Sequence, residues 1–342
     1  MAGEFDLIRC YFSRPTRHTA LAGGDDCALV QVGAGQQLAV STDMLVEGTH
    51  FFPDVDPYLL GWKTLAVNLS DLAAMGATPK WASLALSLPT QRAQDEAWMS
   101  ALAKGFYALA DQYQVDLIGG DTTRGPLNLC VTIMGELPTQ TAMRRAAAQA
   151  GDEIWVSGTL GLASLGLLIA QHDARIANLA LPEQLQQAAL RALQQPQPRV
   201  ELGLCLREWA HACIDVSDGL LADLAHIAVA SQCSAVVHAA ALPLQHLAEV
   251  PIALAQHCVL SGGDDYELCF TAPAQHHLHI KAAAQQLRVK VHCIGKMQRD
   301  ECLTGDAQAE QNQGSRASVI VRDAQGRDIT PAQCGYDHFQ NT

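Results

Sequence analysis

Aspartate stands beside glycine or serine at six places in the sequence, and this arrangement is the first that could support chemistry. The six segments are Gly24-Asp25-Asp26, Ser41-Thr42-Asp43, Asn68-Leu69-Ser70-Asp71, Gly119-Gly120-Asp121, Asp215-Val216-Ser217-Asp218 and Gly263-Asp264-Asp265. Hard divalent cations prefer oxygen ligands, and Mg²⁺ in particular bridges a few carboxylates to phosphate oxygens. Glycine beside a carboxylate lets a ligand approach the backbone closely. The clusters therefore indicate a metal-dependent site for an anionic ligand.

A competing interpretation is that these residues only cap helices and form turns. A single aspartate of this kind is more often a cap, and Asp223 and Asp328 are interpreted in that way. Six clusters are harder to explain as caps, because converging carboxylates raise one another's pKa and cost stability unless a metal ion reverses that balance. Several clusters follow apolar runs (LAVSTD, VDLIGGD, ACIDVSD), so we expect these carboxylates where buried strands end.

The sequence lacks the common phosphate-binding and zinc-protease motifs. It contains no G-x-x-x-x-G-K-[ST] loop, no G-x-G-x-x-G after a strand, no HRD/DFG pair and no H-E-x-x-H. The run His276-His277-x-His279 begins a polar helix and is interpreted as solvated surface. A bound phosphate group would therefore need its positive charge from metal ions and a few arginines.

Composition narrows the class of protein further. The 342 residues are 49% apolar and 17% charged, which favours about two folded domains over disorder. The formal net charge of −13 argues against nucleic acid and anionic membranes as partners. Eleven cysteines without a C-x-x-C pair are typical of reduced thiols. Glu4 and Asp6 stand where a signal peptide would carry basic residues, so we expect a soluble, cytoplasmic protein.

Hydrophobic patterns predict the elements that must position the aspartates. In the first part we expect strands over 27–42 and 127–137 and helices over 58–75 and 95–113. This order favours an α+β domain over a strictly alternating parallel sheet. The composition changes around 138–151, where Pro138 and the pair Arg144-Arg145 precede an Ala-rich segment. The predicted domains are therefore 1–138 and 139–342.

The second part shows the same mixture of elements. We expect a strand over 154–157, helices over 160–171 and 182–194, and a polar loop over 304–317.

Eight segments in one order resemble the thiamine-monophosphate kinase family: GEFDLI, GGDDCAL, VSTDMLVEGTHF, NLSDLAAMGA, LIGGDTTRG, IDVSDGLLADL, SGGDDYELCF and GYDHF. The match runs from about residue 3 to residue 339. The family belongs to the superfamily of aminoimidazole ribonucleotide synthetase, selenophosphate synthetase and a hydrogenase-maturation protein. The resemblance implies an α+β, two-domain, aminoimidazole ribonucleotide synthetase-like architecture. Its N-terminal α+β domain carries a dimerising sheet, and its C-terminal α/β domain completes a cleft for ATP and metals.

The resemblance also implies an activity. Enzymes of the family transfer the γ-phosphoryl group of ATP to thiamine monophosphate, giving thiamine diphosphate and ADP. They use several Mg²⁺ ions and no covalent phospho-enzyme, and they are homodimers. An acidic protein suits this chemistry, because phosphoryl transfer needs positioning and charge neutralisation more than a protein nucleophile.

Family roles carry over residue by residue. The implied metal ligands are Asp26, Ser41, Thr42, Asp43, Asp71, Asp121, Asp215 and Asp218. The implied ATP contacts are Gly120, Asp121, Arg145 and Ser217. The implied substrate contacts are His50, Asp264 and Gln333. Two of these depart from the family pattern, since Asp264 stands where the family has Glu and Gln333 stands where it often has an aromatic residue.

Other functions differ in recognisable features. Selenophosphate synthetase needs a reactive Cys in a Gly-rich segment, whereas Cys10 lies in a helix-like IRCYF. The hydrogenase-maturation relative needs a C-terminal Cys, and aminoimidazole ribonucleotide synthetase has a DGVGTK-like segment where this chain has DMLVEGTH. A non-catalytic magnesium–nucleotide-binding protein is the alternative outside the enzymes. The intact set of implied aspartate ligands argues against it.

Overall fold

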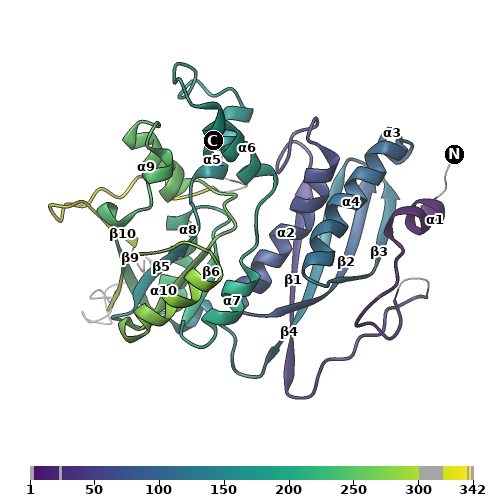
Figure 1. The fold of residues 1–342 in the computed structure, drawn as a ribbon, viewed down its shortest axis with the longest axis horizontal. Coiled ribbons are helices and arrows are strands. Elements are labelled where there is room, and N and C mark those ends of the chain that lie inside the picture. Colours follow the sequence, from purple (N-terminus) through teal and green to yellow (C-terminus); the bar gives the residue numbers. More distant parts are fainter. Residues whose placement is uncertain (1–3, 23–24, 300–318, 337–338, 340–342) are drawn as a thin grey trace, which may run out of the picture. The chain divides into compact units, whose positions relative to one another are not determined.

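The computed structural model describes residues 4–22, 25–299, 319–336 and 339, and the predicted loop at 304–317 lies outside them. The chain divides into two compact units (Figure 1). The first comprises Met1–Ala142 and Gln194–Val200, and the second comprises Met143–Leu193 and Glu201–Thr342. The short segment 194–200 therefore packs with the first unit, where Trp62 Nε1 donates to the Pro196 carbonyl at 2.8 Å.

The first unit is built around a four-stranded sheet with the order β1-β4-β2-β3. Its pairs are antiparallel except for the parallel pair β2–β3. Its elements in chain order are α1 (Glu4–Leu7), a π-helical turn (Ile8–Phe12), β1 (Gln36–Val46), α2 (Pro57–Met75), β2 (Thr78–Leu88), α3 (Thr90–Ala93), α4 (Glu96–Gln112), β3 (Asp116–Arg124) and β4 (Asn128–Pro138).

Helix α2 is the central helix of this unit, and its sequence fixes both ends. The Asp56 carboxylate accepts hydrogen bonds from the backbone N–H groups of Tyr58 and Leu59, and Pro57 occupies the first turn, where its missing N–H costs nothing. Gly76 ends the helix in the left-handed conformation, with φ 67°. Helix α2 is buried along most of its length, so it is held against both the sheet and α4.

Two glycines allow α2 and α4 to approach closely. A Cβ atom at Gly61 would lie 2.0 Å from the Leu102 carbonyl oxygen, and one at Gly105 would lie 1.8 Å from the Tyr58 carbonyl oxygen. Both helices lie on the same side of the sheet (Figure 1). On the other face of edge strand β1, the side chains of Leu38, Val40 and Met44 are 41%, 56% and 51% exposed.

The second unit contains a six-stranded sheet with the order β10-β7-β9-β5-β8-β6. All neighbours are antiparallel except β7 and β10. Its elements are η2 (Arg145–Ala147), β5 (Glu153–Ser157), α5 (Leu162–Ala170), α6 (Glu183–Gln194), α7 (Val200–Leu206), β6 (Ala212–Asp215), α8 (Leu220–Ala230), β7 (Cys233–His238), η3 (Ala239–Ala241), η4 (Gln245–Leu247), α9 (Ile252–Ser261), β8 (Leu268–Ala272), η5 (Ala274–His276), α10 (His277–Gln286), β9 (Val291–Arg299) and β10 (Val319–Arg322).

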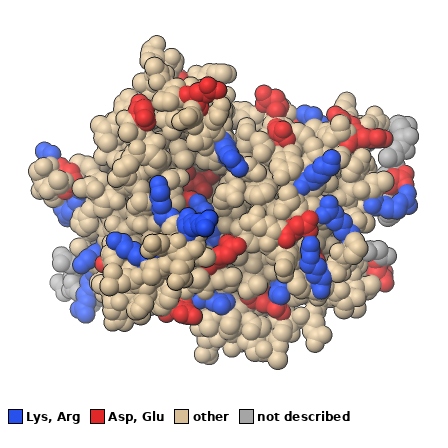
Figure 2. Space-filling view, viewed as in Figure 1, with Lys and Arg blue, Asp and Glu red and all other residues tan. Residues whose placement is uncertain are grey.

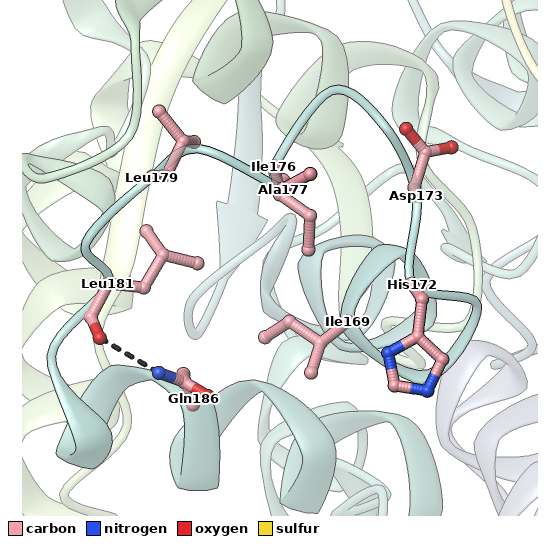
Figure 3. Close-up of a pocket in the computed structure, with 8 residues that line it drawn as sticks. All are labelled: Ile169, His172, Asp173, Ile176, Ala177, Leu179, Leu181 and Gln186. Carbon is pink, nitrogen blue, oxygen red and sulfur yellow. Dashed lines mark hydrogen bonds between the residues drawn. The ribbon is translucent and has the colours of Figure 1, made fainter.

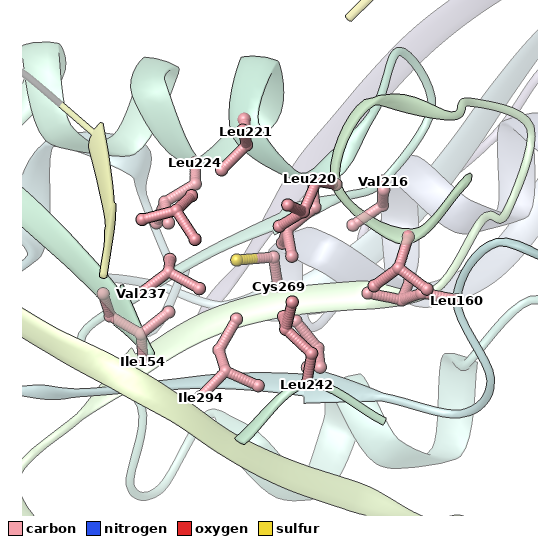
Figure 4. Packing of buried hydrophobic residues seen from close by; sticks show 14 of the residues in the cluster. Ile154, Leu160, Val216, Leu220, Leu221, Leu224, Val237, Leu242, Cys269 and Ile294 are labelled. Carbon is pink, nitrogen blue, oxygen red and sulfur yellow. The ribbon is translucent and has the colours of Figure 1, made fainter. Parts of the chain in front are cut away.

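Part of the core of the second unit lies between this sheet and helix α8. Leu220, Leu221 and Leu224 of α8 face the sheet residues Ile154 and Val237 (Figure 4). Each of these side chains is at most 1% exposed. The core therefore anchors the start of α8, directly after the segment that carries Asp215 and Asp218.

The observed elements confirm the predicted α+β class and most of the predicted elements of the first unit. The helices predicted over 58–75 and 95–113 match α2 and α4 within one residue at each end. Of the two short runs predicted as strands around 27–42, QQLAVSTD begins with β1 at Gln36, although β1 continues past it to Val46, whereas CALVQV (27–32) forms no strand. Among the described residues, no helix is long and apolar enough to cross a membrane.

Candidate active site

Two of the aspartate segments lie against each other in the first unit. The Ser41 hydroxyl on β1 donates a hydrogen bond to Asp71 Oδ2 on α2 at 2.5 Å. The backbone N–H of Asp43 donates to Asn68 Oδ1 at 3.2 Å. The contact joins the VSTD and NLSD segments and gathers carboxylate, hydroxyl and amide oxygens in one place.

Strand and helix periodicities produce this contact. Ser41 and Asp43 pair with Ile133 and Val131, whose side chains are fully buried on the helix side of the sheet. Alternate residues of a strand share a face, so both Ser41 and Asp43 face α2. On the helix, Asn68 and Asp71 are three residues apart and share a face.

The expectation that the carboxylates after apolar runs stand at strand ends is wrong for Asp43, which lies within β1. Asp71 lies within α2, inside the helix predicted over 58–75. Strand β1 is the edge of its sheet and is half-buried at Ser41 and Asp43, so polar residues inside it keep access to solvent. Thr42 points to the opposite face, where its hydroxyl is hydrogen-bonded to the Thr132 hydroxyl at 2.9 Å.

Asp121 also lies within its strand, and its register separates it from Asp43. Asp121 pairs with Ala85 of β2, and Ala85 pairs with Cys130 of β4. Cys130 pairs with Met44 of β1, so Asp121 belongs to the face opposite Asp43. Its neighbour Gly120 has φ 145°, and a Cβ atom there would lie 1.8 Å from the Leu84 carbonyl oxygen. This position therefore requires glycine.

Asp26 lies in the loop before β1, and His50 lies in the loop after it. Asp26 is exposed, and its backbone N–H donates to Asp25 Oδ1 at 3.0 Å. His50 Nδ1 accepts a hydrogen bond from the Val46 N–H at 3.0 Å, which fixes the ring against the end of β1. Lys63 of α2 donates from Nζ to the His50 carbonyl at 3.4 Å and is only 4% exposed.

Sequence reasoning missed Lys63. Its one signal in the sequence is a lysine inside the apolar run GWKTLAV, on a helix that is buried nearly all round.

Two further aspartate segments are joined by backbone hydrogen bonds in the second unit. The N–H of Asp264 donates to the Ser217 carbonyl at 2.8 Å, and the N–H of Tyr266 donates to the Val216 carbonyl at 2.8 Å. A Cβ atom at Gly263 would lie 2.3 Å from the Ser217 carbonyl oxygen, so glycine permits the approach. The pairing brings Asp215, Ser217 and Asp264 into one loop cluster at the end of β6.

Asp223 holds the backbone of this loop in place, in the capping role predicted for it. Its Oδ2 atom accepts hydrogen bonds from the N–H groups of Ser217, Asp218 and Gly219 at 3.0–3.2 Å. Burial raises the pKa of Asp223 to about 7, and the nearby carboxylates of Asp215 and Asp218 add to the shift. The loop therefore concentrates negative charge, which suits a site that receives a cation.

The C-terminal segment closes on the same loop. The N–H of Tyr336 donates to the Asp218 carbonyl at 2.9 Å, and the Ser261 hydroxyl donates to the Gln333 carbonyl at 2.7 Å. The Gln333 side chain itself is exposed. The segments IDVSD, SGGDDYEL and the start of GYDHF, which are far apart in the sequence, therefore meet at one end of the second sheet.

Two further acidic residues support this cluster: Asp265, which the sequence analysis placed in an aspartate segment without a role, and Glu267, which it missed. The Ser157 hydroxyl donates to Glu267 Oε2 at 2.5 Å, and the Gly161 N–H donates to Asp265 Oδ2 at 2.7 Å. Asp265 thereby caps the start of α5, and Glu267 fixes the end of β5. Their only signal is their place within GGDDYEL, which does not distinguish them from Asp264.

Arg145 begins the short 3-10 helix η2 and is exposed, as is Arg144. The Arg145 carbonyl accepts a hydrogen bond from the Ser231 hydroxyl at 2.7 Å. This contact ties the backbone of Arg145 to the end of α8 and leaves its guanidinium group at the surface.

The chemistry of the donor set fits Mg²⁺. The groups around Asp43 and Asp71 are carboxylate, hydroxyl and amide oxygens, which are hard ligands. Among the residues that the structure describes, the predicted aspartates do not form a group of three with ligand atoms within 4.8 Å of one another. The structure therefore places them as pairs and small clusters.

A cavity in the second unit lies away from these clusters (Figure 3). Its volume is about 280 Å³, and it is lined by Ile169, His172, Asp173, Ile176, Ala177, Leu179, Leu181 and Gln186. No predicted site residue lines it. We therefore do not assign the cavity to the candidate active site.

Comparison with known proteins identifies the class first. The family described as AIR synthase related protein matches residues 24–137 with its N-terminal domain and residues 149–306 with its C-terminal domain. The structure of HypE, a hydrogenase maturation protein of Escherichia coli, has a TM-score of 0.72 at 20% identity and covers 98% of this chain and 97% of its own. That likeness concerns the fold alone.

Closer relatives specify the family. The thiamine-monophosphate kinase of Salmonella typhimurium is 44% identical over 98% of both chains, and that of Escherichia coli K12 is 42% identical over 98% of both. A crystal structure of the Stenotrophomonas maltophilia enzyme has 50% identity and a TM-score of 0.76, covering 83% of this chain and 89% of its own. The structure named "AaThiL complexed with AMPPCP and TMP" has 27% identity and a TM-score of 0.71, covering 98% and 97%. The chain belongs to the thiamine-monophosphate kinase family.

Proposed function

We infer that the protein catalyses the ATP-dependent phosphorylation of thiamine monophosphate to thiamine diphosphate. The main structural support is that segments resembling the family, though far apart in the chain, meet within each unit. VSTD meets NLSD in the first unit, and IDVSD meets SGGDDYEL and the C-terminal segment in the second. The relatives that match over nearly the full chain are thiamine-monophosphate kinases.

Magnesium is the cofactor that we propose for these oxygen donors. Asp43, Asp71 and the Ser41 hydroxyl would hold Mg²⁺ on the helix side of the first sheet. Asp121 and Thr42 on the opposite face, and Asp26 in the loop before β1, would hold further ions. Asp215 and Asp218 would hold it in the second unit. Several bound ions would neutralise the charge of the phosphate groups during in-line transfer. The Ser41 hydroxyl orients the Asp71 carboxylate toward β1, and Asp223 fixes the backbone of the 217–219 loop.

The remaining site residues would bind the two substrates. We propose that Gly120, Asp121, Arg145 and Ser217 contact ATP. Arginine is suited to this role because its guanidinium group can donate two parallel hydrogen bonds to phosphate oxygens. His50, Asp264 and Gln333 would contact thiamine monophosphate. The acceptor phosphate attacks directly, so no residue of the chain acts as a covalent nucleophile.

We further propose that the enzyme is a cytoplasmic homodimer. The uncovered face of the first sheet carries Leu38, Val40 and Met44, each more than 40% exposed on the edge strand β1. Monomeric proteins rarely leave adjacent large apolar side chains on a sheet face in water. A second copy of the chain packed on this face would cover them.

Product analysis tests the activity. Purified protein is incubated with Mg²⁺ and ATP, with thiamine monophosphate, thiamine or the substrates of the related superfamily enzymes offered in turn. We expect stoichiometric ADP and thiamine diphosphate with thiamine monophosphate only. Product from another acceptor would favour another superfamily enzyme, and ATP binding without product would favour a magnesium–nucleotide-binding protein.

A further inference from the structure

A second group of metal-binding side chains lies in the second unit, outside the proposed active site. Glu153 at the start of β5, His277 at the start of α10 and Cys293 on β9 place their ligand atoms within 4.8 Å of one another. Among the described residues, no other group of three His, Cys, Asp or Glu side chains meets this distance. The three residues come from three different elements and are distant in the sequence.

The group is partly shielded from solvent. The Glu153 side chain is 12% exposed and the His277 side chain 32% exposed, and His277 Nδ1 hydrogen-bonds Glu153 Oε2 at 2.8 Å. The His277 ring stands edge-on to the Trp155 ring, with centroids 4.6 Å apart. The prediction of a solvated surface for this histidine is therefore wrong, because α10 packs its first residue onto the sheet.

Strand register explains how the thiol and the carboxylate approach each other. Trp155 pairs with Cys293, and the register between β5 and β9 shifts between Ile154 and Trp155. Glu153 lies two residues before Trp155 on β5 and therefore on the same face as Cys293. Burial raises the pKa of the Cys293 thiol, and the Glu153 carboxylate raises it further. The positive charges of Lys296 and Lys281 lower the pKa of the thiol and so partly oppose this increase.

We propose that Glu153, His277 and Cys293 form a binding site for a borderline-soft divalent cation, Zn²⁺. Thiolate, imidazole and carboxylate are the three ligand types that zinc takes in proteins, and three protein ligands leave a fourth position for water. Zinc bonds of about 2.0–2.3 Å hold ligand atoms roughly 3.3–3.8 Å apart. On metal binding, the distance between the His277 and Glu153 ligand atoms would increase slightly from 2.8 Å. The largest distance between two ligand atoms, at most 4.8 Å, would decrease by up to about 1 Å. Rotation of the side chains is enough for both changes.

The site is separate from the phosphoryl-transfer residues of the same unit. Strand β5 begins at Glu153 and ends at Ser157, whose hydroxyl bonds Glu267 beside the Asp215 loop. Four residues of strand separate the two ends by about 13 Å. A cation at this place fastens β5, β9 and α10 to one another without touching the aspartate clusters, so it stabilises the second unit and leaves Mg²⁺-dependent turnover unchanged.

Cobalt is the probe that distinguishes this site from the aspartates. Purified protein, reduced with a phosphine and held in excess Mg²⁺, is titrated with Co²⁺, which gives a thiolate-to-metal absorption band only when a cysteine is a ligand. We expect the band to saturate at one equivalent, to be displaced by Zn²⁺, and to be lost in Cys293→Ser. His277→Gln weakens Co²⁺ binding at least tenfold, since it removes one ligand of three.

Cys205→Ser is the matched control, because Cys205 is also half-buried but belongs to no such group. This variant should keep the band at full intensity. One equivalent of Zn²⁺ should raise the melting temperature of the wild type and of Cys205→Ser but not of Cys293→Ser, since a ligand that binds only the folded state stabilises it. The proposal is overturned if Cys293→Ser keeps the band, if no band forms, or if Zn²⁺ shifts the melting temperature of Cys293→Ser as much as that of the wild type.

Discussion

At the scale of single residues, the contact between β1 and α2 sets the arrangement of the proposed metal ligands. Ser41 binds the Asp71 carboxylate, and Asn68 binds the backbone of Asp43. The first contact orients the Asp71 carboxylate, and the second fixes the backbone that carries Asp43. A cation that bridges preoriented carboxylates loses little free energy to reorganisation, which is how a metal site contributes to transition-state stabilisation.

We expect Asp43→Asn to reduce kcat at least 100-fold and to leave the fold intact. Removing one carboxylate from a metal site costs several kcal/mol of transition-state stabilisation, and each 1.4 kcal/mol corresponds to about tenfold in rate. The amide still fills the same volume on β1. Steady-state kinetics at saturating Mg²⁺ measure the loss, and circular dichroism checks the fold.

Asp54→Asn is the control for this variant, since Asp54 is an exposed residue of the same unit and has no assigned role. It should have wild-type kinetics. Near-normal kcat in Asp43→Asn would remove Asp43 from the metal ligands.

Asp264 is the residue with which we test the substrate contact. Its backbone has φ 65°, and the Tyr266 hydroxyl donates to its Oδ1 atom at 3.2 Å. The left-handed conformation favours Asp and Asn over longer side chains. We expect Asp264→Ala and Asp264→Asn to raise KM for thiamine monophosphate, because both remove a charge that complements the cationic thiazolium ring.

The variant Asp264→Glu restores the family residue and should change KM for thiamine monophosphate more than kcat. Comparing Asn with Ala separates charge from size, since Asn keeps the shape and the backbone preference. A kinetically silent Asp264→Ala would mean that Asp264 only shapes the turn before β8.

At the scale of elements, sequence patterns located those segments whose apolar content and end signals agree. Helices α2 and α4 and strand β4 were found within one residue, because apolar spacing and caps agree there. The run CALVQV at 27–32 is wrong as a strand, although its apolar residues resemble one, and the end of β1 was placed too early, since the polar STD segment resembles a strand end. The meeting of VSTD with NLSD could not be derived from local patterns, because it depends on which face of β1 packs on a helix that begins after the following loop.

His246 of η4 provides a pH-dependent test of how loops support α5. Its Nε2 atom hydrogen-bonds the Leu160 carbonyl at 2.8 Å, in the turn before α5. Burial lowers the pKa of His246 from its usual value of 6.5, and Lys290 lowers it further, while the Leu160 carbonyl partly opposes the shift. The unfolded chain therefore takes up a proton near pH 6.5 that the folded unit does not accept. Stability falls as the pH drops below that value.

We expect His246→Gln to reduce this loss of stability, since glutamine can donate to Leu160 but does not titrate. Melting temperatures at pH 7 and pH 5 measure the effect. His257 and His292 have pKa values lowered by burial as well, so part of the loss remains. His226→Gln, at an exposed position of α8, should keep the wild-type pH dependence. An unchanged difference between pH 7 and pH 5 in His246→Gln would contradict the assignment.

At the scale of the whole molecule, the net charge bears on the substrates, and the exposed apolar residues of β1 bear on a partner subunit. The net charge of −13 suits an enzyme that approaches anionic substrates through bound cations. On the face shown in Figure 2, basic and acidic side chains are interspersed. The exposed residues Leu38, Val40 and Met44 of β1 are apolar instead. The strand register places Asp121 on the same uncovered face of the sheet. A partner that covers this face would therefore lie close to a proposed ATP contact.

We expect Val40→Glu to convert the proposed homodimer into a monomer. Val40 is 56% exposed at the middle of β1, between Leu38 and Met44. A glutamate there would bury a charge without a partner when two copies meet face to face, which costs several kcal/mol per subunit. The side chain reaches solvent in the monomer, so the fold tolerates it. Sedimentation velocity measures the oligomeric state across a range of protein concentrations.

Ile252→Glu is the matched control, because Ile252 is 64% exposed at the start of α9 in the second unit. It adds the same charge at a site outside the sheet face and should leave the dimer intact. Loss of turnover together with loss of the dimer would show that the uncovered face is needed for catalysis, as the position of Asp121 suggests. A wild-type protein that sediments as a monomer at all concentrations, or a Val40→Glu variant that remains a dimer, would refute this assignment of the sheet face.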